Sequence, residues 1–296
     1  MMKAQVRPVL KWAGGKSRSV PHISGVLPQS IETYFEPFVG GAAVFFALAS
    51  QGRFKNAVLS DKNKALIDVY RAVKNARVVQ DLIRILQGYR YDRDEYYRVR
   101  AIDPQTLELA ERAARVIFLN KTGYNGLYRV NSRGQFNVPF GRHRSPTICD
   151  ADNLRAAHTV LKKVSLEVSD FEEVTASAKP GDAVYFDPPY DPVSKTSNFT
   201  SYYKEEFGPD EHERLAKTFS HLVQNGVHAV LSNSSTELTN GLFSSWKPTR
   251  IPVSRPINSK ADARGAIDEL LVVGRPSAKP RSAARSVKPT RRVRRG

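Results

Sequence analysis

The chain has 296 residues and a formal net charge of +17, with an isoelectric point near 10.0. Its hydrophobic fraction of 41% fits a globular protein, and no run approaches the roughly 18 apolar residues of a membrane span. Met1–Arg7 lacks the apolar core of a signal peptide, and the single cysteine, Cys149, excludes an internal disulfide and argues against a cysteine-based metal site. We therefore expect a soluble, cytoplasmic protein with a polyanionic partner and no membrane contact.

Strand-like and helix-like runs alternate along the chain. The helical period is clearest at Lys64–Lys74, Leu107–Asn120, Ala151–Lys162 and Glu211–Gln224. Asn63 is placed to cap the first of these helices. The strand-like runs are Thr33–Phe35, Ala57–Ser60, Val164–Val168, Ala183–Phe186, Val227–Ser232 and Glu269–Val273. This alternation predicts an α/β fold, with a largely parallel sheet covered by helices on both faces.

The alternation is lost between about Asp68 and Asp150. That stretch has helical patterns, many arginines and tyrosines, and a hairpin-like turn at Asn131–Gly134. We interpret residues 68–149 as an insertion that splits a sheet domain made of residues 1–67 and 150–275. A set of surface helices with structural tyrosines is the alternative.

Nine of the basic residues, and no acidic ones, lie between Arg275 and Gly296. Three prolines and almost no large apolar residues accompany them, so residues 276–296 are expected to be a disordered basic tail. Such a tail attracts phosphates without sequence preference.

Two glycine turns come early in the chain. Lys11–Lys16, with the sequence KWAGGK, offers lysines for anions and Trp12 for stacking, but it lacks the spacing of a phosphate loop. Phe35–Ala42, with the sequence FEPFVGGA, lies between a strand and a helix-like run, and Asp61 ends the next strand 21 residues after Gly40. That spacing suits an acidic side chain that binds ribose hydroxyls. Because G-x-G-x-x-G is absent, a nucleoside such as S-adenosylmethionine fits better than a pyrophosphate, although either turn alone could be purely structural.

Aromatic and basic residues flank the expected hairpin. Tyr124–Arg129 precedes the turn and Phe136–Arg142 follows it. Arginine and asparagine are suited to reading base edges, and an aromatic wedge can replace an extruded base. These segments therefore favour contact with nucleic acid over an ordinary loop.

The tetrapeptide Asp187–Tyr190, with the sequence DPPY, follows a buried strand-like run. The carboxylate of Asp187 and a backbone carbonyl fixed by the two prolines can each accept one N–H of an amine on a flat ring. This favours a pyramidal, nucleophilic nitrogen, and Tyr190 can stack on the ring. The tetrapeptide thus indicates methylation of a planar amine, with a simple turn as the alternative.

Together these motifs resemble the Dam-type, or D12 class, family of DNA adenine N6-methyltransferases. The resemblance runs from about Val9 to Val273, and its motifs occur in the family's order: KWAGGK, EPFVGG, NGLYR with GQFNVPFGR, and FDPPY followed by SNFTSYY. It implies a Rossmann-like S-adenosylmethionine-dependent sheet with an inserted, mostly helical target-recognition domain that carries the β-hairpin. It also implies transfer of a methyl group to N6 of adenine in double-stranded DNA, within GATC, by base flipping and direct in-line attack without a metal.

The resemblance also assigns roles to residues. Cofactor contacts are implied for Trp12, Lys16, Glu36, Phe38, Gly40, Asp61 and Asp187. Catalytic roles are implied for Asp187, Pro188, Pro189 and Tyr190, with the Pro188 carbonyl on the amine and Tyr190 stacked on the flipped adenine. DNA contacts are implied for Lys11, Tyr124, Asn125, Leu127, Arg129 and Pro139, with Tyr124 as the wedge.

Three features depart from the family pattern. Ala42 stands where a glycine is common, the loop Asn258–Gly265 is rich in charge, and the basic tail has no counterpart. Two other functions stay open: methylation of an amine on RNA or a free nucleobase, and DNA binding by a protein that has lost catalysis. The expected partner is double-stranded DNA, in association with the nucleoid, and a restriction endonuclease acting on the same site without a stable complex is compatible with it.

Overall fold

The computed structural model describes residues 6–192, 207–253 and 267–276. Within these residues, seven strands form one sheet in the order β3-β2-β1-β4-β5-β7-β6. The strands are β1 Ile31–Glu36, β2 Phe54–Ser60, β3 Val164–Glu167, β4 Ala183–Phe186, β5 His228–Ser234, β6 Thr249–Val253 and β7 Ile267–Gly274. Strands β1 to β5 pair in parallel, whereas β7 runs antiparallel to both β5 and β6. The prediction of an α/β fold with a largely parallel sheet is confirmed.

All six predicted strands belong to this sheet, and β6 is the strand that the sequence pattern missed. It is an edge strand that pairs only with β7. Its short sequence includes Pro252, and a proline counts against a strand unless that strand lies at an edge.

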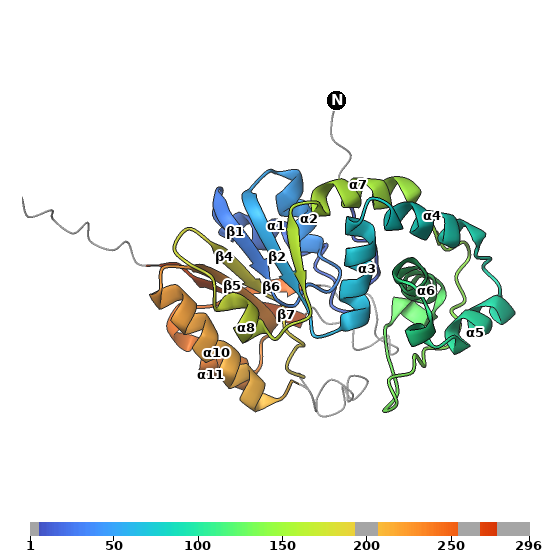
Figure 1. Ribbon diagram of the computed structural model, residues 1–296. Coiled ribbons are helices and arrows are strands. Elements are labelled where there is room, and N and C mark those ends of the chain that lie inside the picture. Colours follow the sequence, from blue (N-terminus) through green and yellow to red (C-terminus); the bar gives the residue numbers. More distant parts are fainter. Residues whose placement is uncertain (1–5, 193–206, 254–266, 277–296) are drawn as a thin grey trace, which may run out of the picture.

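Helices cover both faces of the sheet (Figure 1). They are α1 Val20–Val26, α2 Ala43–Ser50, α3 Lys64–Lys74, α4 Val78–Gly88, α5 Arg93–Ala101, α6 Leu109–Thr122, α7 Ala151–Leu161, α8 Phe171–Thr175, α10 Pro209–Gln224 and α11 Glu237–Leu242. Side chains alternate between the faces along β4: Tyr185 packs into the core with α2, α3 and α7, whereas Val184 and Phe186 pack with α8 and α10. This period of two buries both faces of the central strands.

Helix α3 has the predicted bounds, and its cap is also the predicted one. The Asn63 side chain accepts hydrogen bonds from the backbone N–H groups of Ala65 and Leu66. Helix α6 begins two residues later than predicted, because Pro104–Thr106 forms a separate 3-10 turn and Glu108 with Glu111 forms a capping box.

Helices α4, α5 and α6 lie together beside the sheet, on the right in Figure 1. A separate hydrophobic cluster connects α5 and α6 to the segment that follows them; it consists of Tyr96, Val99, Phe118, Leu119, Phe136 and Val138. Helix α3, which runs across the predicted boundary at residue 68, packs in the main core with α6. The division into two domains stays a prediction.

The segment after α6 folds back on itself around residues 131–134. The backbone N–H of Asn131 donates to the Gln135 carbonyl at 2.9 Å, and that of Asn137 donates to the Arg129 carbonyl at 3.0 Å. The arms pair through isolated antiparallel bridges at Gly123–Phe140 and Val130–Phe136. The predicted hairpin is therefore an irregular one.

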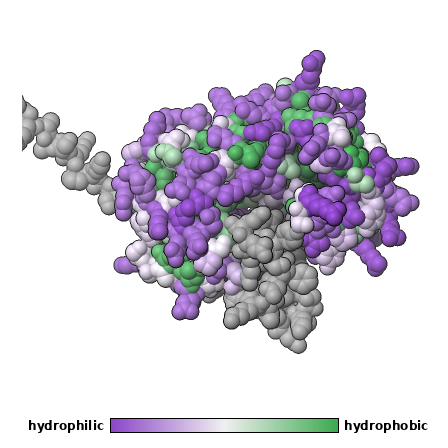
Figure 2. Space-filling view, turned by 60° about the horizontal axis from the view of Figure 1, so that its bottom comes forward, coloured by the Kyte–Doolittle hydropathy of each residue, from purple (hydrophilic) through white to green (hydrophobic). Residues whose placement is uncertain are grey.

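The face shown in Figure 2 is mostly hydrophilic, with hydrophobic residues in separate patches. No helix in the described ranges is long and apolar enough to cross a membrane. The motif SNFTSYY, the loop Asn258–Gly265 and residues 277–296 of the predicted tail lie outside the described residues.

Candidate active site

The site lies where the direction of the strand order changes. The chain passes from β1 outward to β2 and β3, and then returns to β4 on the other side of β1. Glu36 ends β1, and Asp187 follows β4 directly. Open α/β sheets bind their ligands in the crevice at such a switch point, so the topology brings two predicted site residues to the expected place.

Asp187 is held by a buried lysine from the first glycine turn. Lys16 Nζ lies 2.8 Å from Asp187 Oδ1 and 4.5 Å from the centroid of the Tyr190 ring, and it also donates to the Gly14 carbonyl. The Lys16 side chain is only 4% exposed. The structure thus joins the KWAGGK turn to the DPPY tetrapeptide by an ion pair.

Two hydroxyl groups extend this network on the other side of Asp187. Ser232 Oγ, on β5, donates to Asp187 Oδ1 at 3.0 Å, and the Tyr185 hydroxyl lies 2.8 Å from Ser232 Oγ. Since Ser232 uses its only proton on Asp187, Tyr185 is the donor in the second contact. Among the described residues, the partners of Asp187 use Oδ1, which leaves Oδ2 for a substrate.

The charges of the pair are set by burial and by each other. Burial by itself lowers the pKa of Lys16, but the Asp187 carboxylate, together with Tyr190 and Glu269, raises the pKa above its ordinary value. Burial raises the pKa of Asp187, and the ammonium group of Lys16 and the Ser232 hydroxyl oppose that rise. Lys16 is therefore a fixed positive charge that keeps Asp187 available as a carboxylate.

Tyr190 has a polar atom without a partner. Its hydroxyl is buried and makes no hydrogen bond with any described residue. Burial raises the pKa of Tyr190, so the group stays a neutral phenol. The backbone after it is fixed, because the Asp191 N–H donates to Asn233 Oδ1 at 3.2 Å and Ser234 Oγ donates to the Asp191 carbonyl.

The two glycine turns pack against each other at Gly40. A Cβ atom at Gly40 would lie 2.8 Å from Trp12 Cδ1, and the residue has a φ of +44°, so only glycine fits without displacement. The Tyr70 hydroxyl donates to the Gly40 carbonyl at 2.7 Å, and the Gly40 N–H donates to Asp61 Oδ2 at 3.4 Å. Four of the predicted cofactor residues, Trp12, Lys16, Gly40 and Asp61, thus belong to one connected wall.

Asp61 fits a ribose. Its described hydrogen-bond donors are the backbone N–H groups of Asn63, at 2.9 Å, and Gly40. Burial raises the pKa of Asp61 to about 6, and these two hydrogen bonds oppose the rise. The remaining lone pairs can accept the two hydroxyls of a ribose, and the nearby Glu36 and Asp187 suit the positive charges of S-adenosylmethionine.

Ala42 has a backbone conformation that usually needs glycine. Its φ is +57°, which costs about 1–2 kcal/mol for a residue with a side chain. Because Ala42 caps α2 at the end of the second glycine turn, this strain lies two residues after Gly40.

Glu36 is buried at the end of β1 and is held by Tyr34. The Tyr34 hydroxyl donates to Glu36 Oε2 at 2.7 Å. Burial raises the pKa of Glu36 from 4.5 to about 8; the Tyr34 hydrogen bond opposes this, and the charge of Asp187 adds to it. Without ligand, Glu36 is therefore mostly protonated at neutral pH.

The raised pKa predicts a pH-dependent stability that Glu36→Gln removes. Between about pH 4.5 and 8 the folded protein holds one proton more than the unfolded chain, so this group's stabilisation is complete below that window. It is lost as pH rises, by up to about 1.4 kcal/mol per unit. In urea unfolding at pH 5.5 and 8, the free energy of unfolding of Glu36→Gln should rise relative to that of the wild type at the higher pH. Glu32→Gln, at an exposed carboxylate on the same strand, should show no such gain; parallel behaviour of both variants would contradict the assignment.

Phe38, two residues after Glu36, lies in an aromatic cluster. Its ring centroid is 5.5 Å from that of Phe171 and 5.6 Å from that of Phe207. The Arg214 guanidinium lies over the Phe171 ring, 4.0 Å from its centroid, and donates to both carboxylate oxygens of Asp170. The cluster forms an apolar boundary to the site.

The residues predicted to contact DNA share one property, which is exposure to solvent. Tyr124 and Leu127 are 53% and 36% exposed, unusually high values for large apolar side chains. Arg129 Nε donates to Asn137 Oδ1 at 2.7 Å across the hairpin. The full exposed set is Lys11, Tyr124, Asn125, Leu127, Arg129 and Pro139.

Three polar residues that support the site were not predicted from the sequence: Ser232, Tyr34 and Asn120. Ser232 could have been found, since the register pairs Phe186 with Leu231 and so places Asp187 beside the next residue on β5. Tyr34 lies two residues before Glu36 and on the same face of β1, which is the spacing of a neighbour in a strand. Asn120 lies inside a helical pattern, which does not indicate that its amide binds the backbone of Lys11 and Gly126.

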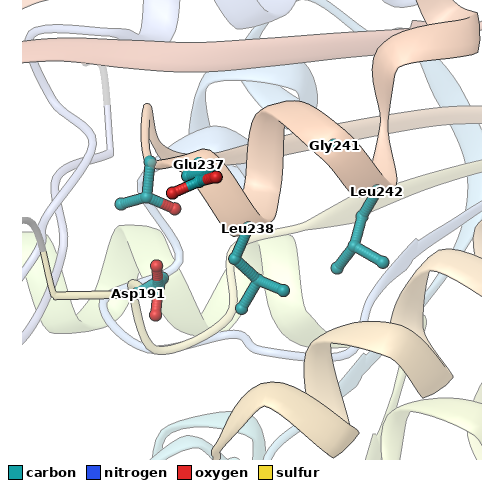
Figure 3. Close-up of a pocket in the computed structure, with 6 residues that line it drawn as sticks. Asp191, Glu237, Leu238, Gly241 and Leu242 are labelled. Carbon is teal, nitrogen blue, oxygen red and sulfur yellow. The ribbon is translucent and has the colours of Figure 1, made fainter.

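A pocket of about 610 Å³ lies just beyond the tetrapeptide (Figure 3). Leu238 and Leu242 project into it from α11, and Asp191 lies at its edge. It contains none of the predicted cofactor residues, so it is not the predicted cofactor site. Among the described residues, no cluster of three or more histidine, cysteine or acidic side chains could hold a metal ion.

A mostly parallel sheet with Glu36, Asp61 and Asp187 at the carboxyl ends of its strands, beside the glycine turn at Gly40, is consistent with Rossmann-like methyltransferases as a class. Residues 12–256 match the family described as D12 class N6 adenine-specific DNA methyltransferase. The chain belongs to this family, and it is an adenine-specific DNA methyltransferase. The family implies S-adenosylmethionine as methyl donor and DNA as substrate.

Relatives span nearly the full chain. It is 40% identical to the type II methyltransferase M1.LlaDCHI of Lactococcus lactis subsp. cremoris, covering 91% of this chain and 96% of that protein. It is 40% identical to the type II methyltransferase M.MjaIII of Methanocaldococcus jannaschii, covering 91% and 99%. Identity to the DNA adenine methylase of Escherichia coli K12 is 34%, covering 91% and 96%.

Proposed function

We propose that this enzyme methylates N6 of adenine within GATC in duplex DNA, after flipping the base out of the helix, by direct in-line transfer. The observation that supports the proposal is the Lys16–Asp187 ion pair, because it joins the turn predicted to contact the cofactor to the tetrapeptide predicted to bind the amine. S-adenosylmethionine, when bound, supplies an activated methyl group on a positively charged sulfur.

The residues of the cofactor wall would hold that donor. Asp61 would accept hydrogen bonds from the ribose hydroxyls, and Trp12 and Gly40 would shape the wall against which the nucleoside lies. Phe38 would contribute apolar contact, and Glu36 would face the positive end of the cofactor. A positive ligand beside Glu36 lowers the pKa of its carboxyl group and favours its ionised form.

The tetrapeptide would activate the amine. Asp187 Oδ2 and the Pro188 carbonyl would each accept one N–H of the adenine amine, which takes the nitrogen lone pair out of conjugation with the ring. The charge that develops on nitrogen during attack is stabilised by the carboxylate, which Lys16 and Ser232 hold in place. Tyr190 would stack on the base, and Pro189 would keep the turn rigid.

The exposed set on the hairpin side would bind the duplex. Tyr124 is large, apolar and exposed, as a wedge into the base stack must be, and Asn125 follows it in the same turn. Leu127, Arg129 and Pro139 would contact bases, and Lys11 would reach the site from the KWAGGK turn. An energetic cost of a few kcal/mol for extruding the base is repaid by contacts of this kind.

A restriction assay on plasmid DNA tests the proposed site. Plasmid from a Dam-negative host that expresses this protein should resist an endonuclease blocked by adenine methylation in GATC, and should be cut by an enzyme that requires that methylation. The catalytically impaired Asp187→Asn variant, expressed to the same level, is the control and should leave the plasmid fully sensitive to the first enzyme. GATC sites that stay unmodified with the wild type would exclude GATC, and transfer of label to RNA but not to duplex DNA would exclude the proposal as a whole.

A further inference from the structure

A buried amide connects the cofactor turn to the turn predicted to contact DNA. Asn120, on α6, is 1% exposed. Its Oδ1 accepts a hydrogen bond from the Lys11 N–H at 2.8 Å, and its Nδ2 donates to the Lys11 carbonyl at 2.7 Å and to the Gly126 carbonyl at 2.8 Å. Both amide protons are therefore used, and they hold two segments that are far apart in the sequence.

The two segments also touch directly. A Cβ atom at Gly126 would lie 2.7 Å from Lys11 Cβ and 2.8 Å from Lys11 Cδ. Beside this contact, Trp12 stacks on Tyr128 with 5.7 Å between ring centroids. The turn that holds Tyr124 thus rests on the turn that holds Lys16.

The turn at Gly126 needs external support. Asn125 and Gly126 have φ values of +53° and +64°, two consecutive residues in the left-handed region. Such a conformation persists when the surroundings fix it. Here the hydrogen bond from Asn120 to the Gly126 carbonyl holds the turn. A change in the position of this amide would move Tyr124 and Leu127 relative to Lys11.

We propose that Asn120 is a positioning residue that couples the DNA-contacting turn Tyr124–Leu127 to the cofactor turn Lys11–Lys16. This inference rests on the proposed function, in which the first turn binds duplex and the second lines the cofactor site. Binding of duplex fixes the Gly126 carbonyl, which fixes Asn120 and hence Lys11, and Lys11 begins the short turn whose other end is Lys16. Each ligand then tightens the binding of the other.

Asn153 provides a matched control. It makes the same paired contact with the backbone four residues before Lys11: its Oδ1 accepts from the Arg7 N–H at 2.9 Å and its Nδ2 donates to the Arg7 carbonyl at 2.9 Å. It has no contact with the turn at Gly126 among its hydrogen bonds. A variant at Asn153 therefore loosens the same N-terminal segment without releasing the DNA-contacting turn Tyr124–Leu127.

The experiment compares the dissociation constant of the non-reactive cofactor analogue sinefungin with and without the methylatable duplex, by calorimetry on the full chain. In the wild type, duplex should tighten sinefungin by about fivefold or more, as expected for coupled sites. Asn120→Ala should reduce that factor to less than about twofold, and Asn153→Ala should keep the wild-type factor. Gly126→Ala places a Cβ atom against Lys11 and so pushes the two turns apart; it should reduce the coupling factor as Asn120→Ala does. If Asn120→Ala does not fold, Gly126→Ala alone tests the inference.

The inference would be overturned if Asn120→Ala and Gly126→Ala both kept the coupling factor of the wild type. It would also be overturned if duplex left the dissociation constant of sinefungin unchanged in the wild type itself. Failure of the wild type to bind sinefungin or duplex at all would instead overturn the proposed function. Equal loss of coupling in Asn153→Ala would show a general loosening of the N-terminal segment and would also overturn the specific role of Asn120.

Discussion

Asp187→Asn should lower the rate of methyl transfer to duplex DNA by about 10²–10³-fold or more, while the affinity for the duplex stays close to that of the wild type. The asparagine keeps the volume of the side chain and an oxygen that can accept from Lys16 and Ser232. It removes the charge that stabilises the amine as it becomes positive, so the loss falls on the chemical step. Single-turnover transfer of a labelled methyl group, with duplex binding measured separately, checks both parts.

Asp191→Asn is the matched control for that variant. Asp191 follows the tetrapeptide directly, and its backbone rather than its carboxylate is held by Asn233 and Ser234. The same chemical change at this position should leave the single-turnover rate near the wild-type value. Near wild-type transfer by Asp187→Asn, or an equal loss in both variants, would refute the role assigned to Asp187.

The location of this site could be predicted from local sequence because its parts lie at strand ends. The buried run Ala183–Phe186 marks a central strand, so Asp187 had to emerge at its carboxyl end. Asp61 was found in the same way, at the end of β2. Periodicity and turn chemistry are local, and they were sufficient to position these carboxylates along the sheet.

The partners of these carboxylates could not be predicted in the same way. The contact of Lys16 with Asp187 joins two turns that are far apart in the chain, and nothing in either sequence specifies the other. Asn120 is similar, since an asparagine in the middle of a helix gives no indication that its amide binds the backbone of Lys11. At the sheet edge, the strand β6 was missed for a related reason: its pairing with β7 is set by tertiary contacts, while its own short sequence contains a proline.

The buried ion pair predicts a large and testable coupling in stability. Lys16→Met should lower the free energy of unfolding by about 3–5 kcal/mol, because it leaves the largely buried Asp187 carboxylate, 20% exposed, without its partner. The double variant Lys16→Met with Asp187→Asn should be more stable than Lys16→Met alone, although it carries one more substitution, since the unpaired charge is gone. Urea unfolding of the wild type, both single variants and the double variant gives the coupling directly.

The surface pair Lys55–Glu32 supplies the reference for this cycle. Its atoms are equally close, at 2.7 Å, but its side chains are 67% and 51% exposed, so Lys55→Met should cost no more than about 1 kcal/mol. A loss in Lys16→Met as small as that in Lys55→Met would mean that solvent screens the charge of Asp187 as fully as that of the surface carboxylate. In that case the carboxylate would not be the weakly screened, fixed acceptor that activation of the adenine amine requires, and the mechanism proposed for the tetrapeptide would fail together with the stability prediction.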